Sequence, residues 1–424
     1  MKGEITKGRN NERKKEERGG SHFHTCSTSI HHPSLLLPVV VGQPIALAMK
    51  VYQLEEIESV TSTPEFENAL ISALADGFVA FSNGKFNAPP IQTLAAPPMA
   101  KFSCANVSDN DASSKEYAAQ VCIKTGYITG ADTFVVKVAS GGYPLPSNSG
   151  CVQVFSQKTG KMEALLMDEG ILTELRTAAA GAVAALCLAP VDVKRIGILG
   201  TGIQARYQLR FLKHVTDCRH VLVYGRTDAS VRKYVEDCEK EGWNVTVAEH
   251  PNDLLENCEL IVTTTSSREP VLGVDWKYTY ESSAEGRPRG KIPLQHITCI
   301  GSDAPGKAEL GLDLLVAAER AGGWLVADSK AQTAERGEFQ RTDPRTLGHS
   351  VQPIMEPTGT GWRVAELGKV LQVNAHMKSQ GKKNISDHYR EEMPISIFDS
   401  SGVAIQDCVC AELACSALVS SEED

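Results

Sequence analysis

The chain lacks the cysteine and histidine spacings of common metal sites. Its 12 cysteines are scattered between Cys26 and Cys415, no two form a CxxC pair, and no HExxH motif occurs. Zinc and iron–sulfur sites need such closely spaced ligands, so we expect no bound metal. Scattered cysteines in a chain of this length are typical of small buried residues in a reducing compartment.

Long apolar runs and an excess of basic residues are also missing. No apolar run reaches the ~20 residues that a membrane-spanning helix needs. The 52 acidic residues outnumber the 43 basic ones and give a net charge of −9. These features argue against a membrane protein and against a nucleic-acid-binding protein. The 42% hydrophobic content is enough for a packed core, and 424 residues suggest roughly two to three domains.

The first 48 residues differ from the rest of the chain. Residues 1–34 are mostly charged, Gly, Ser and His residues, and the apolar run that follows at 35–41 is short. This arrangement is a poor match to a signal peptide, and four glutamates argue against a standard transit peptide. We expect residues 1–48 to be a disordered extension of a cytoplasmic protein, with organelle targeting as the alternative. Met49 opens the folded part.

Residue patterns after Met49 predict two kinds of region. The first combines strands with one strong alanine-rich helix, from Thr173 to Leu188, and includes a turn at Thr159-Gly160. Its strands are predicted at 120–124, 133–139 and 151–156, after a polar loop at 105–116.

The region after Pro190 alternates strand patterns with helical or loop segments. Such alternation predicts an α/β fold with a parallel sheet and crossover helices. A strand at 395–398 and a helix at about 403–418 follow near the end of the chain, after charged or Gly- and Pro-rich insertions at 280–291 and 341–361. The earlier strands are predicted at 194–199, 220–224, 244–248, 259–264, 296–300 and 323–327.

A glycine-rich turn follows the first strand of this second region. The segment Gly200 to Ala205 reads GTGIQA, a GxGxxA pattern, and opens a predicted helix at 203–214. The first glycine permits the tight turn, the second lets the backbone approach a pyrophosphate, and the alanine permits close helix–strand packing. Free N–H groups at the helix N-terminus would face the phosphates. We expect a dinucleotide cofactor here; a glycine turn without a ligand is the alternative.

The residues after the second strand indicate which dinucleotide is used. NAD sites usually have an acidic residue at this place for the ribose 2′-hydroxyl. This sequence instead has Arg226 and Thr227, with no carboxylate before Asp228. Because an arginine can pair with a 2′-phosphate, we expect NADP(H) to be preferred. The alternative is that Arg226 is a solvated residue at a helix start and that NAD(H) is also used.

Four motifs, in this order, resemble the ornithine cyclodeaminase/mu-crystallin family. The similarity extends over about residues 50–418. The motifs are LTELRTAA at 172–179, the GxGxQ turn at 200–204, IGSDAPGKAEL at 300–310 and FDSSGVA at 398–404.

This resemblance implies a two-domain organisation. A Rossmann-type dinucleotide-binding domain is expected at 191–390. A mixed α+β substrate-binding and dimerisation domain, built from both chain ends, is expected at 49–190 and 391–424. The family also implies a small imino- or amino-acid substrate and a homodimer.

Three residues acquire roles from the same resemblance. Arg176 is expected to hold the substrate α-carboxylate, because a guanidinium grips a carboxylate in a planar, bidentate way. Lys137, inside an apolar strand pattern, is expected to touch the carboxylate or the reacting nitrogen. Asp303 follows a strand of the parallel sheet and is expected to be the acid/base group. The residue types alone leave simpler alternatives open: a surface arginine, an edge-strand lysine and a helix cap.

Lys124 and Gln92 mark a departure from the ornithine-specific members of the family. Those members place a glutamate near the position of Lys124 to bind the distal ammonium of ornithine, and an arginine near Gln92. A lysine would repel a second ammonium and attract a second carboxylate. We therefore expect an acidic imino acid as substrate, unless Lys124 is a solvated strand residue.

The favoured function is an NAD(P)H-dependent imino-acid reductase or, equivalently, an amino-acid dehydrogenase. One alternative is ornithine cyclodeaminase, which recycles bound NAD⁺. The other is a non-catalytic NADPH-binding protein of the crystallin type, against which Asp303 argues, because those members lack this aspartate. The expected cofactor-binding residues are Thr177, Gly200, Thr201, Gly202, Ile203, Gln204, Ala205, Arg226, Thr227, Thr264, Thr265 and Ser266.

Overall fold

The computed structural model describes most of the chain after Met49. The described residues are 49–95, 120–141, 148–273, 294–320, 323–341, 364–381, 385 and 395–423. They belong to one compact unit, Leu47–Asp424. The expected extension 1–48, the loop 105–116, the insertion 280–291 and all but the first residue of the insertion 341–361 lie outside the described residues.

The first region contains, within the described residues, a seven-stranded sheet in the order β1-β7-β6-β5-β4-β2, with β3 also paired to β4. All pairs are antiparallel except β1 with β7. The three predicted strands and the turn at Gly160, where φ is +69°, are confirmed. The strands are β1 (Lys50–Tyr52), β2 (Phe86–Asn87), β3 (Gln92–Ala95), β4 (Gln120–Ile128), β5 (Thr133–Gly141), β6 (Asn148–Ser156) and β7 (Met162–Leu166).

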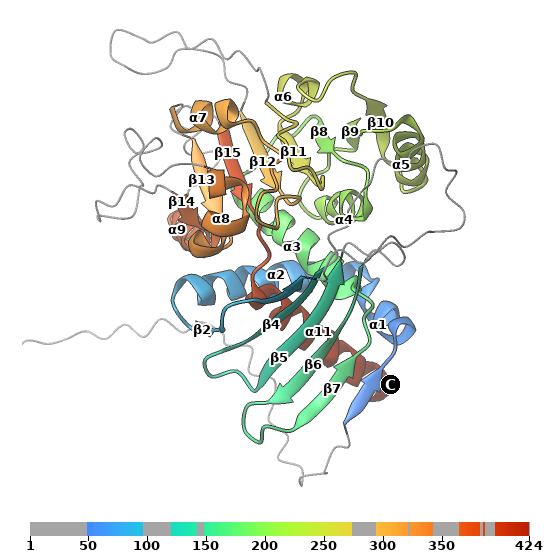
Figure 1. Cartoon of the computed structure of the whole chain (residues 1–424), viewed down its shortest axis with the longest axis vertical. Helices are drawn as coiled ribbons and strands as arrows, with labels where there is room; N and C mark the ends of the chain where they lie inside the picture. Colours follow the sequence, from blue (N-terminus) through green and yellow to red (C-terminus); the bar gives the residue numbers. More distant parts are fainter. Residues whose placement is uncertain are drawn as a thin grey trace, which may run out of the picture. The chain divides into compact units, whose positions relative to one another are not determined.

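Helices cover one face of this sheet (Figure 1). The C-terminal helix α11 contacts β4, β5 and β6 as well as the other three helices. Residues of β5 alternate between the two faces. Val135 and Lys137 are buried on the helix-covered face, while Phe134, Val136 and Val138 on the other face are half-buried. The helices are α1 (Leu54–Thr61), α2 (Pro64–Ser82), α3 (Ile171–Leu188) and α11 (Ala404–Glu423).

The second region contains an eight-stranded parallel sheet in the described part of the chain, in the order β10-β9-β8-β11-β12-β15-β13-β14. Its first five strands have the 3-2-1-4-5 order of a Rossmann fold, as the alternating pattern predicts. The strands are β8 (Ile196–Leu199), β9 (His220–Tyr224), β10 (Asn244–Val247), β11 (Leu260–Thr263), β12 (Gln295–Cys299), β13 (Trp324–Ala327), β14 (Val364–Glu366) and β15 (Ile395–Asp399).

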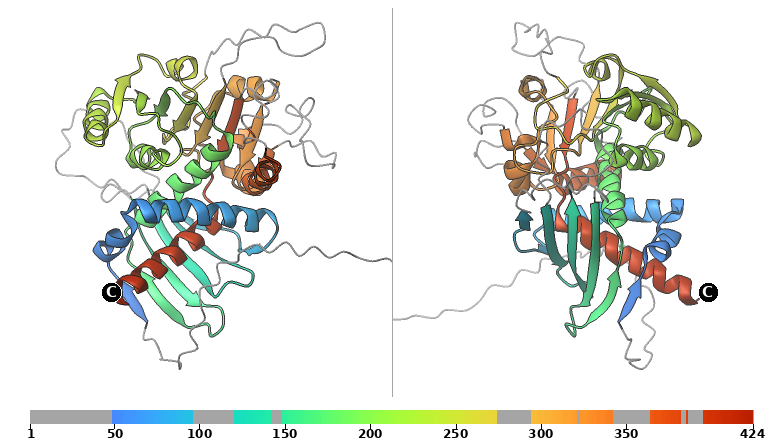
Figure 2. Two further views of the ribbon diagram at one scale, coloured as in Figure 1. Left: turned by 180° about the vertical axis from the view of Figure 1, so that it is seen from behind. Right: turned by 45° about the vertical axis from the view of Figure 1, so that its right-hand side comes forward.

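Short helices lie on both faces of this sheet (Figure 2). Separate hydrophobic clusters, one including Leu199 and Ile297 and the other Ile196 and Ile198, are buried within the second region. The helices are α4 (Ile203–Leu212), α5 (Asp228–Lys240), α6 (Asp253–Asn257), α7 (Leu312–Arg320), α8 (Lys330–Arg336), a 3₁₀ turn η1 (Glu338–Arg341) and α9 (Leu367–Ser379).

One expected boundary is wrong. The division at residue 391 assigns the last strand to the first domain, but β15 pairs in parallel with β12 and β13 of the second sheet. All five residues of β15 are buried, which suits a strand inside a parallel sheet that is covered on both faces. The chain returns to the first region only after Asp399, through the segment 400–403 that leads into α11.

Two helices of the described chain, α3 and α11, are long and apolar enough to cross a membrane by length and composition. Both pack inside the fold. Helix α3 contacts α2, α4 and α11 together with β12 and β15, and α11 contacts three strands and three helices. Their hydropathy is therefore accounted for by core packing.

Candidate functional site

The glycine-rich turn follows β8, at the point where the strand order of the Rossmann-like sheet reverses. Gly200 has a φ of +105°, and its N–H donates to Tyr224 O at 2.8 Å. A Cβ at Gly200 would come within 2.7 Å of Thr264 Oγ1, whereas a Cβ at Gly202 would have no neighbour within 4 Å. The fold itself therefore requires the first glycine, while the second faces open space.

The start of α4 is suited to an anionic ligand. Its N-cap residue is Gly202, which has no side chain, and no side-chain cap is formed within the described part of the chain. The first N–H groups and the positive end of the helix dipole therefore suit an anion. Ile203 in the first turn is 49% exposed although it is a large apolar residue, and Ala205 is fully buried. An uncapped helix start beside open space fits the phosphates of a dinucleotide.

The loops around this turn carry the other expected cofactor residues. Arg226 and Thr227, after β9, are exposed. Thr227 Oγ1 donates to Ser230 Oγ at 2.8 Å. Thr264 Oγ1 donates to Leu199 O at 3.1 Å, and Thr265 and Ser266 continue the same loop after β11. These residues lie at the carboxyl edge of the parallel sheet, where ligands of such sheets bind.

Two further expected cofactor residues, Gln204 and Thr177, also make hydrogen bonds within the protein. Gln204 Nε2 donates to the backbone oxygen of Glu174 at 3.2 Å and also to its carboxylate. Thr177 Oγ1 donates to Thr173 O at 2.7 Å, and Thr177 O accepts from Gln208 Nε2 at 3.2 Å. These contacts fasten α4 to α3, the helix that carries Arg176. A cofactor contact of Gln204 or Thr177 stays a prediction.

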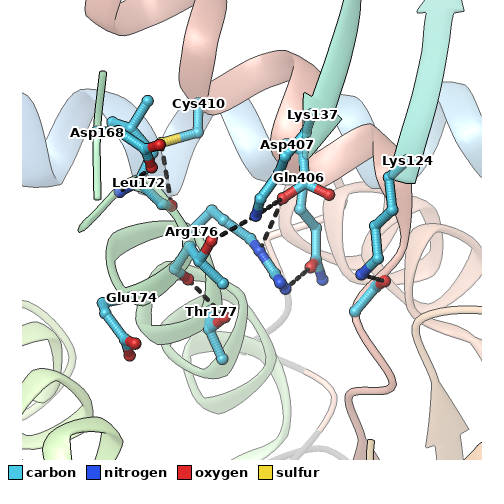
Figure 3. Close-up of polar contacts among 12 residues, drawn as sticks. Lys124, Lys137, Asp168, Leu172, Glu174, Arg176, Thr177, Gln406, Asp407 and Cys410 are labelled. Atoms are coloured by element: carbon cyan, nitrogen blue, oxygen red, sulfur yellow. Dashed lines mark hydrogen bonds and ion pairs between the residues drawn. The ribbon is translucent and has the colours of Figure 1, made fainter. Parts of the chain in front are cut away.

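A cluster of charged side chains lies where β4, β5, α3 and α11 meet (Figure 3). Lys137 Nζ is 2.7 Å from Asp407 Oδ1 and also donates to Thr173 Oγ1. Arg176 Nε is 3.1 Å from the same carboxylate oxygen, and its Nη1 donates to Gln406 Oε1 at 2.6 Å. The structure thus brings together the two cations that the resemblance assigns to the substrate carboxylate. Both are almost fully buried.

Asp407 is the centre of this cluster. Burial alone would raise the pKa of its carboxyl group, but the charges of Lys137, Arg176 and Lys124 outweigh burial and hold the pKa well below its ordinary value. Asp407 is therefore a permanent anion. Its Oδ2 atom is buried without a hydrogen-bond partner among the described residues.

Lys124 joins the cluster from β4. Its Nζ donates to Gly402 O at 2.6 Å. A Cβ at Gly402 would lie 3.1 Å from Arg176 Nη1 and 3.3 Å from Lys124 Nζ, so both cations lie close to this glycine. Burial lowers the pKa of Lys124 to about 8; Asp407 opposes the shift, and the charges of Arg176 and Lys137 add to it. Lys124 thus belongs to the cluster and is not a solvated strand residue.

Asp303 and Gln92 are not in contact with the cluster among the described residues. Asp303 is 52% exposed, and its carboxylate is 2.5 Å from Lys307 Nζ. Gln92 is exposed at the start of β3, where it pairs with Ile123 of β4. Their expected roles in acid/base chemistry and substrate binding remain predictions.

Glu309 organises the loops at the carboxyl edge of the second sheet. Its fully buried carboxylate accepts from Thr263 Oγ1 at 2.6 Å, from the N–H of Gly301 at 2.8 Å and from the N–H of Thr265. Burial, with the nearby charge of Glu338, raises the pKa of Glu309 to about 7. One carboxylate therefore ties the cofactor loop after β11 to the Asp303 loop after β12.

Sequence reasoning missed Gln406, Asp407 and Glu309. Gln406 and Asp407 follow the FDSSGVA motif after one residue, Ile405, and form a polar pair in the first turn of a largely apolar helix. A buried lysine such as Lys137 needs a buried acid, so this polar pair was the available signal. Glu309 lies inside the IGSDAPGKAEL motif, next to apolar residues that bury it.

Comparison with known proteins places this geometry in a family. An uncharacterised cyclodeaminase of Sinorhizobium fredii is 33% identical over 301 residues, which cover 70% of this chain and 79% of the relative. The iminosuccinate reductase of Paracoccus denitrificans is 27% identical over 289 residues, or 66% of this chain and 77% of the reductase.

Solved structures share the fold. An archaeal alanine dehydrogenase dimer with bound NAD superposes with a TM-score of 0.65 at 24% identity, covering 88% of this chain and 97% of that chain. The family model for the ornithine cyclodeaminase/mu-crystallin family matches residues 136–422, which include Lys137, Arg176, the glycine-rich turn and Asp407. With most of the chain matched, including the turn and the cluster residues Lys137, Arg176 and Asp407, the protein belongs to the ornithine cyclodeaminase/mu-crystallin family.

Proposed function

We propose that the protein is an NAD(P)H-dependent imino-acid reductase, equivalently an amino-acid dehydrogenase, that acts on an imino acid with two carboxylates. The charge balance of the cluster carries this proposal. Among the described residues, Lys124, Lys137 and Arg176 surround the carboxylate of Asp407, and the buried Asp168 adds a second carboxyl group whose charge acts on Lys137. Three cations therefore face two acidic groups of the protein, and a dicarboxylate adds the negative charge that the cluster lacks.

Each carboxylate has a suitable partner in the cluster. Arg176 and Lys137 are the natural partners of the α-carboxylate, because they lie together on either side of Asp407 Oδ1. Lys124, held at Gly402, is the natural partner of the second carboxylate. An ornithine side chain would instead bring an ammonium next to Lys124, and like charges in a partly desolvated site repel by several kcal/mol. The name of the iminosuccinate reductase relative agrees with this preference.

The open turn at Gly202 and the uncapped start of α4 supply the cofactor site. The nicotinamide, when bound, supplies or accepts the hydride. Arg226 is exposed beyond β9, where it can pair with a 2′-phosphate, and this supports NADPH as the preferred cofactor. Asp303 is the proposed donor of the proton to the substrate nitrogen, which requires its loop to bring it from Lys307 to the cluster.

The outer face of the first sheet supports a homodimer. Phe134 and Phe155 stack there with ring centroids 4.8 Å apart, and Leu94 is 60% exposed. Together with the half-buried Ile123 and Val136 they form an apolar face, and the helices that contact these strands lie on the other side. Val136→Glu should give a monomer in light scattering; an unchanged mass would place the dimer contact elsewhere.

The main test follows NADPH oxidation with imino acids formed in solution. Iminosuccinate and a neutral cyclic imino acid are compared by kcat/KM for NADPH oxidation, and ornithine is assayed separately by the formation of proline and ammonia. The proposal expects iminosuccinate to be the best substrate. If only the neutral imino acid reacted, the protein would still be an imino-acid reductase, but its substrate would not carry a second carboxylate.

Asp303→Asn tests the proton donor. The exchange keeps the shape of the side chain and removes its ionisation. Turnover should fall by roughly 10²-fold or more, with little change in NADPH affinity. Nearly intact turnover would point to another donor, with Lys137 the first choice.

Ornithine cyclodeaminase is the second candidate, because the relative with 33% identity is named a cyclodeaminase. That reaction recycles its cofactor and gives no net NADH. Conversion of ornithine to proline and ammonia without a change in nicotinamide absorbance would establish it and refute the charge argument.

A further inference from the structure

Gln406 has a buried hydrogen-bond donor that the fold leaves unused. The residue is completely buried in the first turn of α11. Its Oε1 accepts from Arg176 Nη1 at 2.6 Å, but its Nε2 has no partner among the described residues. Burying a donor without a partner destabilises the fold, so such atoms usually meet a ligand or water.

The direction of this amide is fixed by chemistry. A guanidinium group has only donors, so the amide oxygen must face Arg176 and the nitrogen must point away from it. Figure 3 shows the Gln406 side chain between Arg176 and Lys124. Arg176 and Lys124 both come close to the position that a Cβ would take on Gly402, in the segment just before α11. The unused donor is therefore placed among cations.

A carboxylate is the ligand that suits these groups. A cationic neighbourhood excludes a cation, and an N–H donor requires an acceptor. Carboxylate oxygens accept several hydrogen bonds at once and are strengthened by charge. Asp407, the carboxylate beside this group, contacts Lys137 and Arg176 through Oδ1. Its Oδ2 makes no hydrogen bond with Gln406 Nε2, because both atoms lack a partner among the described residues.

We propose that Gln406 Nε2 donates to a carboxylate oxygen of the substrate, so that Gln406 binds substrate directly and helps to select a dicarboxylate. This inference rests on the proposed function, because it takes an imino-dicarboxylic acid as the substrate. The amide serves two neighbours: its oxygen orients Arg176, and its nitrogen completes the site between Arg176 and Lys124.

Gln406→Glu separates these two tasks. Glutamate keeps an oxygen for Arg176 but replaces the donor with a second oxygen, which repels a carboxylate and attracts Lys124. A residue that only orients Arg176 would tolerate this exchange. A residue that donates to substrate would not, and KM for iminosuccinate should rise at least about tenfold while the dissociation constant of NADPH stays unchanged.

The control and a second variant complete the kinetic test. Gln380→Glu adds the same charge at the exposed end of α9, where Gln380 contacts His376, and should leave KM unchanged. Gln406→Leu removes both hydrogen bonds and should also raise KM. If Gln406→Glu retained the KM of the unaltered protein, the residue would act only through Arg176 and the inference would fall.

Calorimetry with succinate, in the presence of NADP⁺, keeps this test independent of turnover. Binding by the unaltered protein and loss of binding in Gln406→Glu would support the inference even if no imino acid reacted. Turnover of iminosuccinate with equal KM in both proteins would overturn the inference and leave the proposed function standing. Absence of both turnover and succinate binding in the unaltered protein would overturn both.

Discussion

The cofactor turn and the charged cluster are built on opposite principles. The turn is left unfilled: the position above Gly202 is open, and no side chain caps α4. The cluster is closely paired, because Lys137, Arg176 and Lys124 already have partners within the protein. The turn can therefore receive a ligand without losing a contact, whereas a substrate entering the cluster has to share cations with Asp407 and Gln406.

The largest effect is expected from removing the anion that holds the cluster together. Asp407→Asn leaves Lys137 and Arg176 buried without their counter-charge, and breaking a buried pair in this way typically costs about 3–5 kcal/mol. Urea unfolding monitored by circular dichroism measures the loss. The control is Glu422→Gln, which breaks the exposed pair with Lys50 and should leave the free energy of unfolding almost unchanged. Equal losses in the two variants would mean that the cluster is not the tightly coupled element described above.

The two glycines of the turn should respond differently to the same change. Gly200→Ala places a Cβ 2.7 Å from Thr264 Oγ1 at a positive φ and should destabilise the fold by roughly 1–3 kcal/mol. Gly202→Ala meets nothing within 4 Å, so the fold should keep its stability while NADPH binding weakens about tenfold or more. Thermal unfolding and fluorescence titration distinguish the two. Tight NADPH binding by Gly202→Ala would show that the open position is not used.

Lys124 gives the cluster a pH dependence that the turn does not share. Its pKa of about 8 lies below the ordinary value, so its positive charge is lost as the pH rises through 8. The kcat/KM for a dicarboxylic imino acid, which reports the free enzyme, should therefore fall above pH 8. In Lys124→Met this fall should disappear, and kcat/KM should be low throughout. As a control, the affinity for NADPH is measured over the same pH range, and it should not fall above pH 8 as kcat/KM does.

The smallest effect is expected at the rim of the turn. Arg226→Ala should reduce the preference for NADPH over NADH, because the exposed guanidinium is the proposed partner of the 2′-phosphate. The change is expected to be several-fold, as for one solvent-exposed charge. Equal dissociation constants for NADPH and NADH in the unaltered protein would show that Arg226 does not select the 2′-phosphate.

The turn was predictable from sequence because its determinants are local. The GxGxxA residues, the strand before them and the helix after them are contiguous, so periodicity and glycine spacing identify them together. Ten of the fifteen strands in the described chain were likewise recognised from apolar patterns, whereas β1, β2, β3, β7 and β14 were not predicted. The place of β15 was not, because strand order is a tertiary property and one buried apolar run fits either sheet.

The cluster was only partly predictable for the opposite reason. Lys124, Lys137 and Arg176 came from a family resemblance, and their neighbours on α11 are separated from them by more than 200 residues of chain. Gln406 and Asp407 stand out in the sequence only as a polar pair in a largely apolar helix, which does not show which cations they contact. The bonds of Gln204 to Glu174 show the same limit, since a residue inside a cofactor motif also fastens two helices.

The fastening of the two regions determines which movements the protein can make. On one side, α4 is bound to α3 through Gln204 and Gln208, and to α2 through Arg210 and His214, which both contact Glu67. On the other side, α9 packs on α2, and Lys369 reaches Asn83 at 2.9 Å. A hinge rotation would break both sets of contacts at once. We therefore expect that only the exposed 303–307 loop moves when Asp303 approaches the substrate, and that the two regions keep their relative positions.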